Sequence, residues 1–406
     1  MLCVFASATH SLGGDWPQIL GPKRDGHAID ETLADNWSTE KPTRQWTAKV
    51  GEGYAGPAVV GDRLFAFHRV AKSEVLSCLD TTNGQEIWKT SWNASYGGGA
   101  NGDHGPRCVP LVDDGKVYVF GAAGDLHCVE IKDGKKLWSR RLGRELKAKD
   151  GHFGFGSTPI LIDGTLLLNV GGSKSASVVG IDPNNGETKW QQFEDEASYS
   201  SPTQWTSGGT DYGLFVTRMH TIAIRPSDGK TILQLPFGRS GATVNAAVPL
   251  VVGESEVFLT ASYGIGAKLV SLRNPAEPET VWQSDTILSS QFPTPVLHGD
   301  YLYGIHGRED GPPASLRCVR VRDGKVMWER DGVGMAHLIL ADGKLLIMTV
   351  EGELVLLAPT SEKYTELGRI TVASTTARAL PALSSGTWFV RNNGRNGRLS
   401  AWSIPK

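Results

Sequence analysis

Short apolar segments recur in pairs along most of the chain, each pair separated by a turn of the Gly-Asp or Asp-Gly type. The stretches "GPAVVGDRLFAF" at 56–67 and "MAHLILADGKLLIM" at 335–348 are examples. Their apolar residues do not alternate strictly with polar ones, which is the pattern of β-strands that are covered on both faces. We therefore predict eight strand pairs, at 56–67, 107–120, 156–169, 200–216, 245–260, 292–305, 335–348 and 378–390.

A second strand–turn–strand pattern follows these pairs, and it usually ends in tryptophan. The stretches "CLDTTNGQEIW" (78–88) and "CVEIKDGKKLW" (128–138) share the same spacing. Their Asn-Gly and Asp-Gly steps suit a tight hairpin turn, because such turns need positive φ. Leu233 and Leu367 take the tryptophan position in two further repeats. We expect the tryptophans of the outer strands to be structural docking residues: Trp46, Trp88, Trp138, Trp190, Trp282 and Trp328.

The two patterns together give four short strands in about 40–50 residues, the period of a propeller blade. The eighth repeat, 378–404, lacks its outer strand, whereas 43–50 is a spare strand with no inner strands before it. The sequence therefore predicts an all-β, eight-bladed β-propeller of four-stranded antiparallel blades. We expect the N-terminal strand 43–50 to complete the last blade and close the ring. Two β-sandwiches are the competing architecture, but they would not explain so regular a period.

The N-terminal residues divide into two predicted segments ahead of the propeller. Residues 1–14 are apolar and then small, and Ala6-Ser7-Ala8 resembles a signal-peptidase site. We interpret 1–14 as a residual signal segment, with an ordinary disordered N-terminus as the alternative. Residues 15–42 are expected to be a lead-in that packs on the propeller, and 43–406 a single propeller domain. No later stretch is long and apolar enough to predict a transmembrane span.

Charge and cysteine content narrow the possible functions. The 41 Lys and Arg residues balance 43 Asp and Glu residues, which argues against a general nucleic-acid binder. None of the five cysteines lies in a CxxC motif or next to another cysteine, so we predict no metal site. His127 and Cys128 stand side by side, but the positions equivalent to Cys128 are mostly small, among them Gly180 and Ser271. We therefore interpret Cys128 as a packing residue.

The repeat that ends in tryptophan resembles the docking motif of the pyrroloquinoline quinone (PQQ)-like propeller superfamily, over about residues 43–404. The lead-in "DWPQILGPKRDG" (15–26) and the stretch 104–130 are similar to segments of exported bacterial PQQ-like repeat proteins. The superfamily includes quinoprotein alcohol dehydrogenases and the lipoprotein scaffold of the outer-membrane β-barrel assembly machinery. The resemblance implies the eight-bladed fold and a bacterial protein of the cell envelope, periplasmic or secreted.

The resemblance leaves two classes of function open. Quinoprotein dehydrogenases carry a vicinal disulfide on the quinone and a Glu, Asn and Asp around Ca²⁺, and this chain has no adjacent cysteines. We therefore predict a monomeric binding or protein-interaction platform, with a protein partner or a small polar or carbohydrate ligand. No cofactor is predicted, since no motif supports PQQ with calcium. The alternative is a PQQ-dependent oxidoreductase, or another enzyme that uses the central channel.

The loops that enter each inner strand should ring one mouth of the channel, where propeller ligands commonly bind. Their arginines could hold an anionic group, and their aromatic rings could stack on a sugar. The competing interpretation is that polar residues there hold water and cap strand ends. We expect Arg107 and Arg378 to be dispensable for folding. The candidate ligand-binding residues are Asp103, His104, Arg107, His152, Tyr199, Asn245, Gln291, His337 and Arg378.

Overall fold

The computed structural model describes residues 14–100 and 102–406. The described chain forms a ring of eight four-stranded antiparallel sheets, with one short helix, α1 (Leu142–Glu145). The first four blades, in chain order, are blade 1 with β2 (Ala58–Val60), β3 (Arg63–Val70), β4 (Ser73–Asp80) and β5 (Glu86–Asn93); blade 2 with β6 (Leu111–Asp113), β7 (Lys116–Phe120), β8 (Leu126–Glu130) and β9 (Lys136–Arg140); blade 3 with β10 (Ile160–Ile162), β11 (Thr165–Gly172), β12 (Ala176–Ile181) and β13 (Thr188–Gln192); and blade 4 with β14 (Thr203–Ser207), β15 (Thr210–Val216), β16 (His220–Ile224) and β17 (Thr231–Pro236).

The second half of the ring repeats this arrangement. Its strands are β18 (Leu250–Val252), β19 (Glu256–Ala261), β20 (Gly266–Ser271) and β21 (Glu279–Ser284) in blade 5; β22 (Val296–His298), β23 (Tyr301–His306), β24 (Ser315–Arg320) and β25 (Val326–Arg330) in blade 6; β26 (Ala336–Ala341), β27 (Lys344–Thr349), β28 (Glu353–Leu357) and β29 (Glu366–Thr371) in blade 7; and β30 (Ala382–Ser384), β31 (Thr387–Arg391), β32 (Arg398–Ser403) and β1 (Thr43–Lys49) in blade 8.

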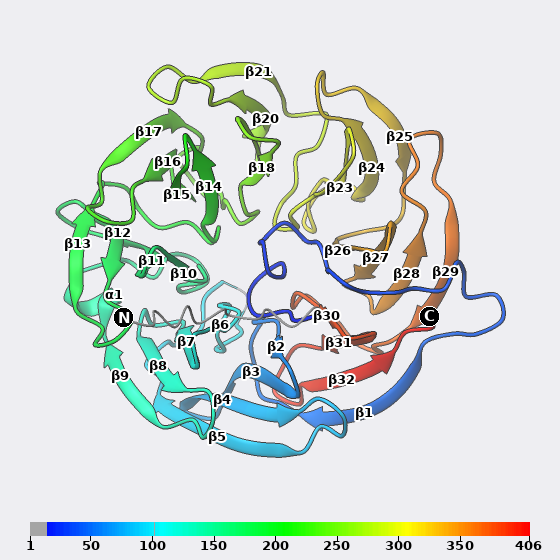
Figure 1. The fold of residues 1–406 in the computed structure, drawn as a ribbon, viewed down its shortest axis with the longest axis horizontal. Coiled ribbons are helices and arrows are strands. Elements are labelled where there is room, and N and C mark those ends of the chain that lie inside the picture. Colours follow the sequence, from blue (N-terminus) through cyan, green and yellow to red (C-terminus); the bar gives the residue numbers. More distant parts are fainter. Residues whose placement is uncertain (1–13, 101) are drawn as a thin grey trace, which may run out of the picture.

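Blade 8 joins the two ends of the chain. Strand β1 lies beside β32 (Figure 1) and pairs with it antiparallel, with Trp46 opposite Ala401. The predicted all-β, eight-bladed ring, closed by the N-terminal strand, is confirmed. The residues 1–13 lie outside the described part of the chain, so the expected signal segment stays a prediction.

Six outer-strand tryptophans contact the following blade in the same way. Each indole Nε1 donates a hydrogen bond to a carbonyl oxygen in the last turn of that blade. Beneath Trp138, Gly186 has a φ of +77°, and a Cβ there would lie 2.7 Å from the indole. Glycine therefore serves both the turn and the close approach of the ring. The bonds run from Trp46 to Thr81 (2.8 Å), Trp88 to Ile131 (3.1 Å), Trp138 to Pro183 (3.0 Å), Trp190 to Pro226 (2.8 Å), Trp282 to Val321 (2.7 Å) and Trp328 to Thr360 (2.7 Å).

Two positions of the predicted repeat register are wrong. Leu269, and not Ser271, lies opposite Trp282, and Gly368, and not Leu367, takes the tryptophan position of blade 7. The turns between the third and fourth strands of blades 5 and 7, 272–278 and 358–365, are longer than the equivalent turn 131–135 of blade 2. The register shifts after Leu269 and Leu356 have a counterpart after Cys128 in blade 2. Gly368 leaves room for Trp37 of the lead-in, which is 1% exposed and packs directly over it.

His127 and Cys128 are packing residues. The imidazole of His127 stacks on Trp92 of blade 1, with ring centroids 4.2 Å apart, and one ring nitrogen is 2.8 Å from the Ser139 hydroxyl. Burial lowers the pKa of His127 to about 3, so the ring is neutral at ordinary pH. Cys128 is a buried free thiol, as are Cys78, Cys108 and Cys318.

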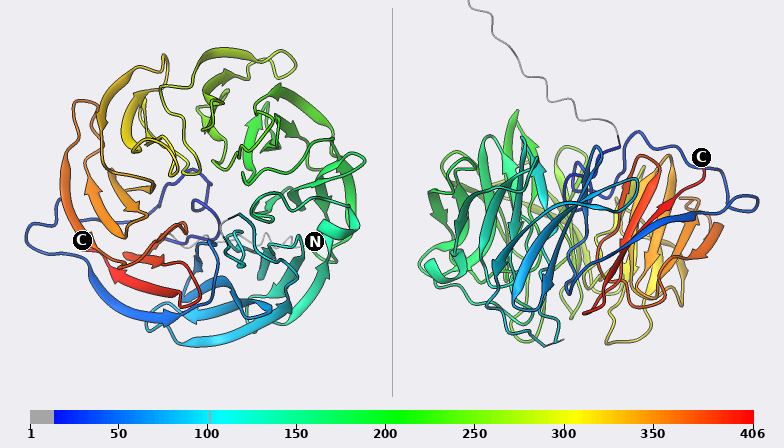
Figure 2. Two further views of the ribbon diagram at one scale, coloured as in Figure 1. Left: turned by 180° about the vertical axis from the view of Figure 1, so that it is seen from behind. Right: turned by 90° about the horizontal axis from the view of Figure 1, so that it is seen from below.

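The lead-in crosses one face of the ring and reaches into its centre (Figures 1 and 2). Trp16 pairs with Val59 of blade 1, and Ala28 donates to Leu340 of blade 7. Between them the guanidinium of Arg24, 1% exposed, donates to Gln18 Oε1 (2.7 Å) and to the carbonyl oxygens of Thr158 (3.3 Å), Pro159 and Pro202 (2.8 Å). Arg24 thereby joins the lead-in to the inner strands of blades 3 and 4.

The two faces of the ring carry different connections. On the lead-in side, the first two strands of a blade are joined by short turns such as 61–62 and 163–164. The other side, here called the loop face, carries the long connections into the inner strands, including 94–110, 141–159 and 237–249. Because the lead-in fills the opposite side, the loop face offers the accessible mouth of the ring.

Candidate functional site at the channel mouth

Two arginines flank one tyrosine at the mouth on the loop face. The Cζ atoms of Arg107 and Arg378 lie 5.4 and 5.6 Å from the ring centroid of Tyr54. Arg107 also lies 5.3 Å from the ring centroid of Tyr96. Cation–π contacts of this kind hold a guanidinium in a fixed position. Burial raises the pKa of Tyr54, so its hydroxyl stays protonated beside the two cations.

Carboxylates balance these arginines. Arg107 lies 3.6 Å from Asp103 Oδ1, and their side chains are 10% and 7% exposed. Its guanidinium also donates to the carbonyl oxygens of Gly105 and Asp103. Arg378 forms a two-contact ion pair with Glu309. Glu309 lies in the loop between the second and third strands of blade 6, here called the second loop of the blade. Arg107 therefore holds its own loop together, whereas Arg378 links blade 6 to blade 8.

Glu52 provides a third charged centre beside Tyr54. One of its oxygens lies 3.2 Å from His104 Nδ1, and the other accepts a hydrogen bond of 3.1 Å from Arg395. A cleft of about 570 Å³ runs between these groups, with Glu52, Asp103 and Glu309 against Arg378 and Arg395. Its charges nearly cancel, so it suits hydrogen bonding to a partner surface or a neutral polar ligand more than selection of an anion.

Two of the residues predicted from the sequence, Gln291 and His337, hold the backbone of Glu309 and Arg378. Gln291 Oε1 accepts the backbone N–H of Glu309 (2.8 Å), and its Nε2 donates to the Tyr263 hydroxyl (2.8 Å). His337 Nε2 lies 2.8 Å from the carbonyl oxygen of Arg378. Burial lowers the pKa of His337 to about 4, so the neutral ring donates that hydrogen bond. Both residues position the Arg378–Glu309 pair.

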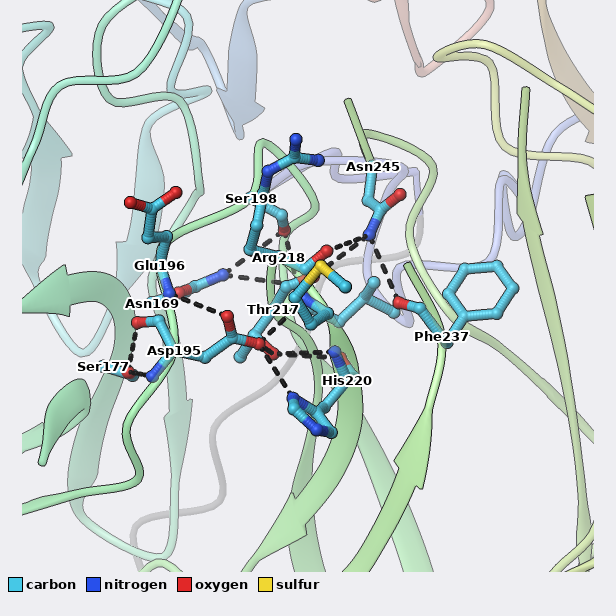
Figure 3. Close-up of polar contacts among 12 residues, drawn as sticks. Asn169, Ser177, Asp195, Glu196, Ser198, Thr217, Arg218, His220, Phe237 and Asn245 are labelled. Carbon is cyan, nitrogen blue, oxygen red and sulfur yellow. Dashed lines mark hydrogen bonds and ion pairs between the residues drawn. The ribbon is translucent and has the colours of Figure 1, made fainter. Parts of the chain in front are cut away.

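The remaining predicted residues lie elsewhere around the mouth. His152 is exposed, and its ring centroid lies 6.3 Å from that of Phe153. The Tyr199 hydroxyl accepts the backbone N–H of Phe153 (2.8 Å). Asn245 is 1% exposed, and its amide donates to the carbonyl oxygens of Thr217 (3.1 Å) and Arg218 (3.2 Å) (Figure 3). Asn245 and Tyr199 thus cap loop backbone, and a ligand role for them stays a prediction.

Asp195 organises a further polar network next to Asn245 (Figure 3). Its Oδ2 accepts hydrogen bonds from the Thr217 hydroxyl (2.7 Å) and the Met219 N–H (2.8 Å), and lies 3.0 Å from His220 Nδ1. These contacts join Asp195, in the loop after blade 3, to residues 217–220 of blade 4. The network fixes the turn 217–219 of blade 4 against the loop that leaves blade 3.

No group of three or more His, Cys, Asp or Glu side chains is placed to hold a metal ion within residues 14–100 and 102–406. None of the helices in that part of the chain is long and apolar enough to span a membrane.

Residues 71–330, more than half of the chain, match the family model described as outer membrane protein assembly factor BamB. The chain belongs to the BamB family. A BamB of Salmonella typhimurium is 27% identical over 295 residues, covering 69% of this chain and 70% of that protein. The Escherichia coli BamB is 25% identical with the same coverage.

Solved structures show the same propeller fold. BamB from Moraxella catarrhalis superposes with a TM-score of 0.65 at 14% identity, covering 89% of this chain and 98% of that chain. Quinohemoprotein alcohol dehydrogenase from Comamonas testosteroni gives a TM-score of 0.71 at 13% identity, covering 97% of this chain and 81% of that chain. The fold is therefore common to BamB proteins and to quinone-dependent enzymes, and the fold alone does not distinguish their functions.

The residues of this BamB-family chain do not fit a quinone–calcium site. The described cysteines are buried free thiols in blades 1, 2 and 6, so none forms the vicinal disulfide that such a site would require. Arg24 reaches into the centre of the ring, where it is bound by backbone carbonyls. At the mouth, Glu52, Asp103 and Glu309 are each engaged with an arginine or a histidine.

Sequence reasoning missed four members of the central group: Glu52, Tyr54, Glu309 and Arg395. Glu52 and Tyr54 lie in 51–57, the loop that enters the first inner strand, so the same rule that selected the other loops could have found them. Glu309 and Arg395 come from the second loops of blades 6 and 8, which carry no signal of their own.

Proposed function

We propose that this protein is a periplasmic interaction platform that acts as a monomer in outer membrane protein assembly, and that its partner docks on the loop face. The match of residues 71–330 to the BamB family carries this proposal, since the matched relatives are named as outer membrane protein assembly factors. The structure supports the choice of face, because the lead-in covers the other one (Figure 2).

The mouth suits a protein partner better than a small substrate. Its central cleft carries charges of both signs that already pair with each other, and Arg395 projects from it with a side chain 84% exposed. Complementary charges on a partner would govern orientation and association rate more than affinity.

Removal of the gene from its host tests the proposal. The amount of β-barrel protein in the outer membrane should fall, as measured by quantitative mass spectrometry, and the intact gene should restore it. The variant Arg395→Glu should restore it less well than its control Lys135→Glu, which changes an exposed turn on the opposite face. Unchanged outer-membrane composition, together with dye-linked alcohol oxidation by the purified protein supplied with PQQ and Ca²⁺, would favour the enzyme alternative instead.

A further inference from the structure

The crevice in front of blade 8 lacks the large side chains that fill the crevices before blades 2 and 6. In blade 6, Arg317 pairs with Glu329 across the sheet and donates to the carbonyl oxygens of Thr286 and Ile287 in blade 5. In blade 2, the equivalent His127 stacks on Trp92. In blade 8 the equivalent pair is Ser400 and Thr47, whose hydroxyl oxygens are 3.3 Å apart. These two short side chains leave a cleft of about 400 Å³ between blades 7 and 8.

The lining of this cleft is rich in hydrogen-bonding groups and contains no carboxylate among the described residues. Hydroxyl groups come from both blades, while Val372 and Val390 supply apolar surface. A volume of this size lies within the range of small-molecule sites, about 300–1,000 Å³. The polar side chains of the lining include Arg44, Thr47, Thr371, Ser374, Arg398 and Ser400.

Positive charge is concentrated on the same face of the sheet. Lys49 lies directly opposite Arg398 in the β1–β32 pair, and like charges in this arrangement repel. Arg44, Lys49 and Arg398 form no ion pair within the described part of the chain. A second cavity of about 420 Å³ shares Thr47 and Arg398 with the first and adds Lys49. The cleft therefore ends at the exposed Arg398, with the exposed Lys49 across the β1–β32 pair.

The other end of the cleft presents an indole. Trp402 lies opposite Arg44, whose Cζ is 5.8 Å from the ring centroid. Trp402 is 9% exposed, and its Nε1 donor has no acceptor among the described residues. The Trp402 ring, covered by the Arg44 guanidinium, therefore closes this end of the cleft.

We propose that this crevice binds a phosphate monoester of a small hydroxylated molecule, of the sugar phosphate class. The phosphate would lie between Lys49 and Arg398, because a phosphate monoester carries nearly two negative charges at pH 7 and suits two cations. The carrier would extend past Thr47 and Ser400 toward Trp402. Arg398 and Trp402, which lie opposite Lys49 and Arg44, are four residues apart on β32 and about 13 Å apart along an extended strand, which accommodates a sugar ring and its phosphate between them.

The chemistry of the lining favours a sugar phosphate over a neutral sugar, a carboxylate or free phosphate. A neutral sugar would leave the Lys49–Arg398 repulsion in place, and a carboxylate would neutralise only one of the two charges. Free phosphate would satisfy both cations but would not use the hydroxyl groups of Thr47 and Ser400 or the indole of Trp402. This site is separate from the proposed partner cleft, which Arg378 and Glu309 line.

Calorimetric titration of the full chain with glucose 6-phosphate, inorganic phosphate, glucuronate and glucose tests the proposal. Glucose 6-phosphate should bind saturably and more weakly as salt is added, whereas glucose should give no heat of binding. In two-dimensional NMR, the indole N–H signal of Trp402 can be assigned because it is missing from the spectrum of the Trp402→Phe variant. This signal should shift when glucose 6-phosphate is added to the wild-type protein. Equal affinity for inorganic phosphate would support the two cation contacts and overturn the hydroxylated carrier.

Variants of the crevice residues test whether glucose 6-phosphate binds in the crevice. Lys49→Gln and Arg398→Gln should each weaken glucose 6-phosphate binding by about tenfold or more, since each removes a charge-assisted contact. Lys49→Arg should retain binding. The matched control is Arg320→Gln, because Arg320 is an arginine of the equivalent third strand in blade 6 that already pairs with Asp323. Absence of binding to the wild-type protein, or binding unchanged in the Lys49→Gln and Arg398→Gln variants, would overturn the proposal.

Discussion

The indole Nε1 of Trp138 donates a hydrogen bond of 3.0 Å to the carbonyl oxygen of Pro183, in the last turn of the next blade. Trp46 makes the same contact with Thr81, although it comes from the N-terminal strand of the chain. The junction between blades 8 and 1 is therefore docked like the other five.

Replacement of Trp138 by alanine should lower the free energy of unfolding by about 3 kcal/mol, since it removes a largely buried aromatic side chain and a hydrogen bond. Urea unfolding followed by circular dichroism measures the change. The neighbouring variant Leu137→Ala is the control, because Leu137 is 37% exposed and should have little effect. Equal effects of both variants would contradict the docking role of Trp138.

Replacement of Arg24 by methionine should lower the free energy of unfolding by about 2–4 kcal/mol, because several carbonyl acceptors in the centre of the ring lose a charged donor. The lead-in should also become more accessible to protease, which limited proteolysis with mass spectrometry would show. Lys23→Met is the matched control, since Lys23 is exposed next to it. If Arg24→Met leaves both stability and proteolysis unchanged, the guanidinium does not anchor the lead-in.

Arg107 and Arg378 should differ in their contribution to folding, contrary to the expectation from sequence that neither is needed. Arg107→Ala should cost about 1–3 kcal/mol, because its side chain is 10% exposed and it binds two carbonyls of its own loop. Arg378→Ala should cost less than about 1 kcal/mol, since its ion pair with Glu309 is partly exposed. Thermal and urea unfolding of the two variants, measured side by side, would reveal equal costs if this distinction is wrong.

Acid should destabilise the protein through three buried histidines. Burial lowers the pKa of His68 and His127 to about 3 and that of His337 to about 4, whereas the unfolded values are near 6.5. Between the folded and unfolded pKa values, each of these histidines binds more protons in the unfolded chain than in the folded protein. Each histidine therefore lowers the free energy of unfolding as pH falls from 6.5, by up to about 1.4 kcal/mol per pH unit.

Glu74 acts in the opposite direction over part of this range. Burial raises its pKa to about 7, so the stability it contributes at low pH is lost as pH rises through that value. A comparison between wild type and His127→Gln isolates the histidine. Urea unfolding between pH 4.5 and 7.5 should show similar slopes for both proteins above pH 6.5, and below it a slope shallower by up to about 1.4 kcal/mol per pH unit in the variant. Parallel pH profiles would mean that the pKa of His127 in the folded protein is close to its value in the unfolded chain.

The sites were harder to predict than the ring. The loops that enter the inner strands could be located by counting strands. Asp103 and Arg378 line one cleft, while Arg107 and His104 contact its lining residues Tyr54 and Glu52. Asn245 and His337 are buried instead, because the same loops need donors for their backbone carbonyls. A sequence shows that a polar residue lies near a strand end, but not whether it faces backbone or solvent.

The number of blades, their closure by residues 43–50 and the positions of the outer-strand tryptophans could be predicted without coordinates, because turn glycines and paired apolar strands are local signals that repeat along the chain. The three-dimensional arrangement alone shows that Arg24 enters the centre of the ring. It also decided that Tyr54 lies between Arg107 and Arg378, and that Lys49 and Arg398 meet beside a cleft. These contacts join residues from different blades or from the two ends of the chain, so they depend on how the blades are placed around the axis, which no local pattern records.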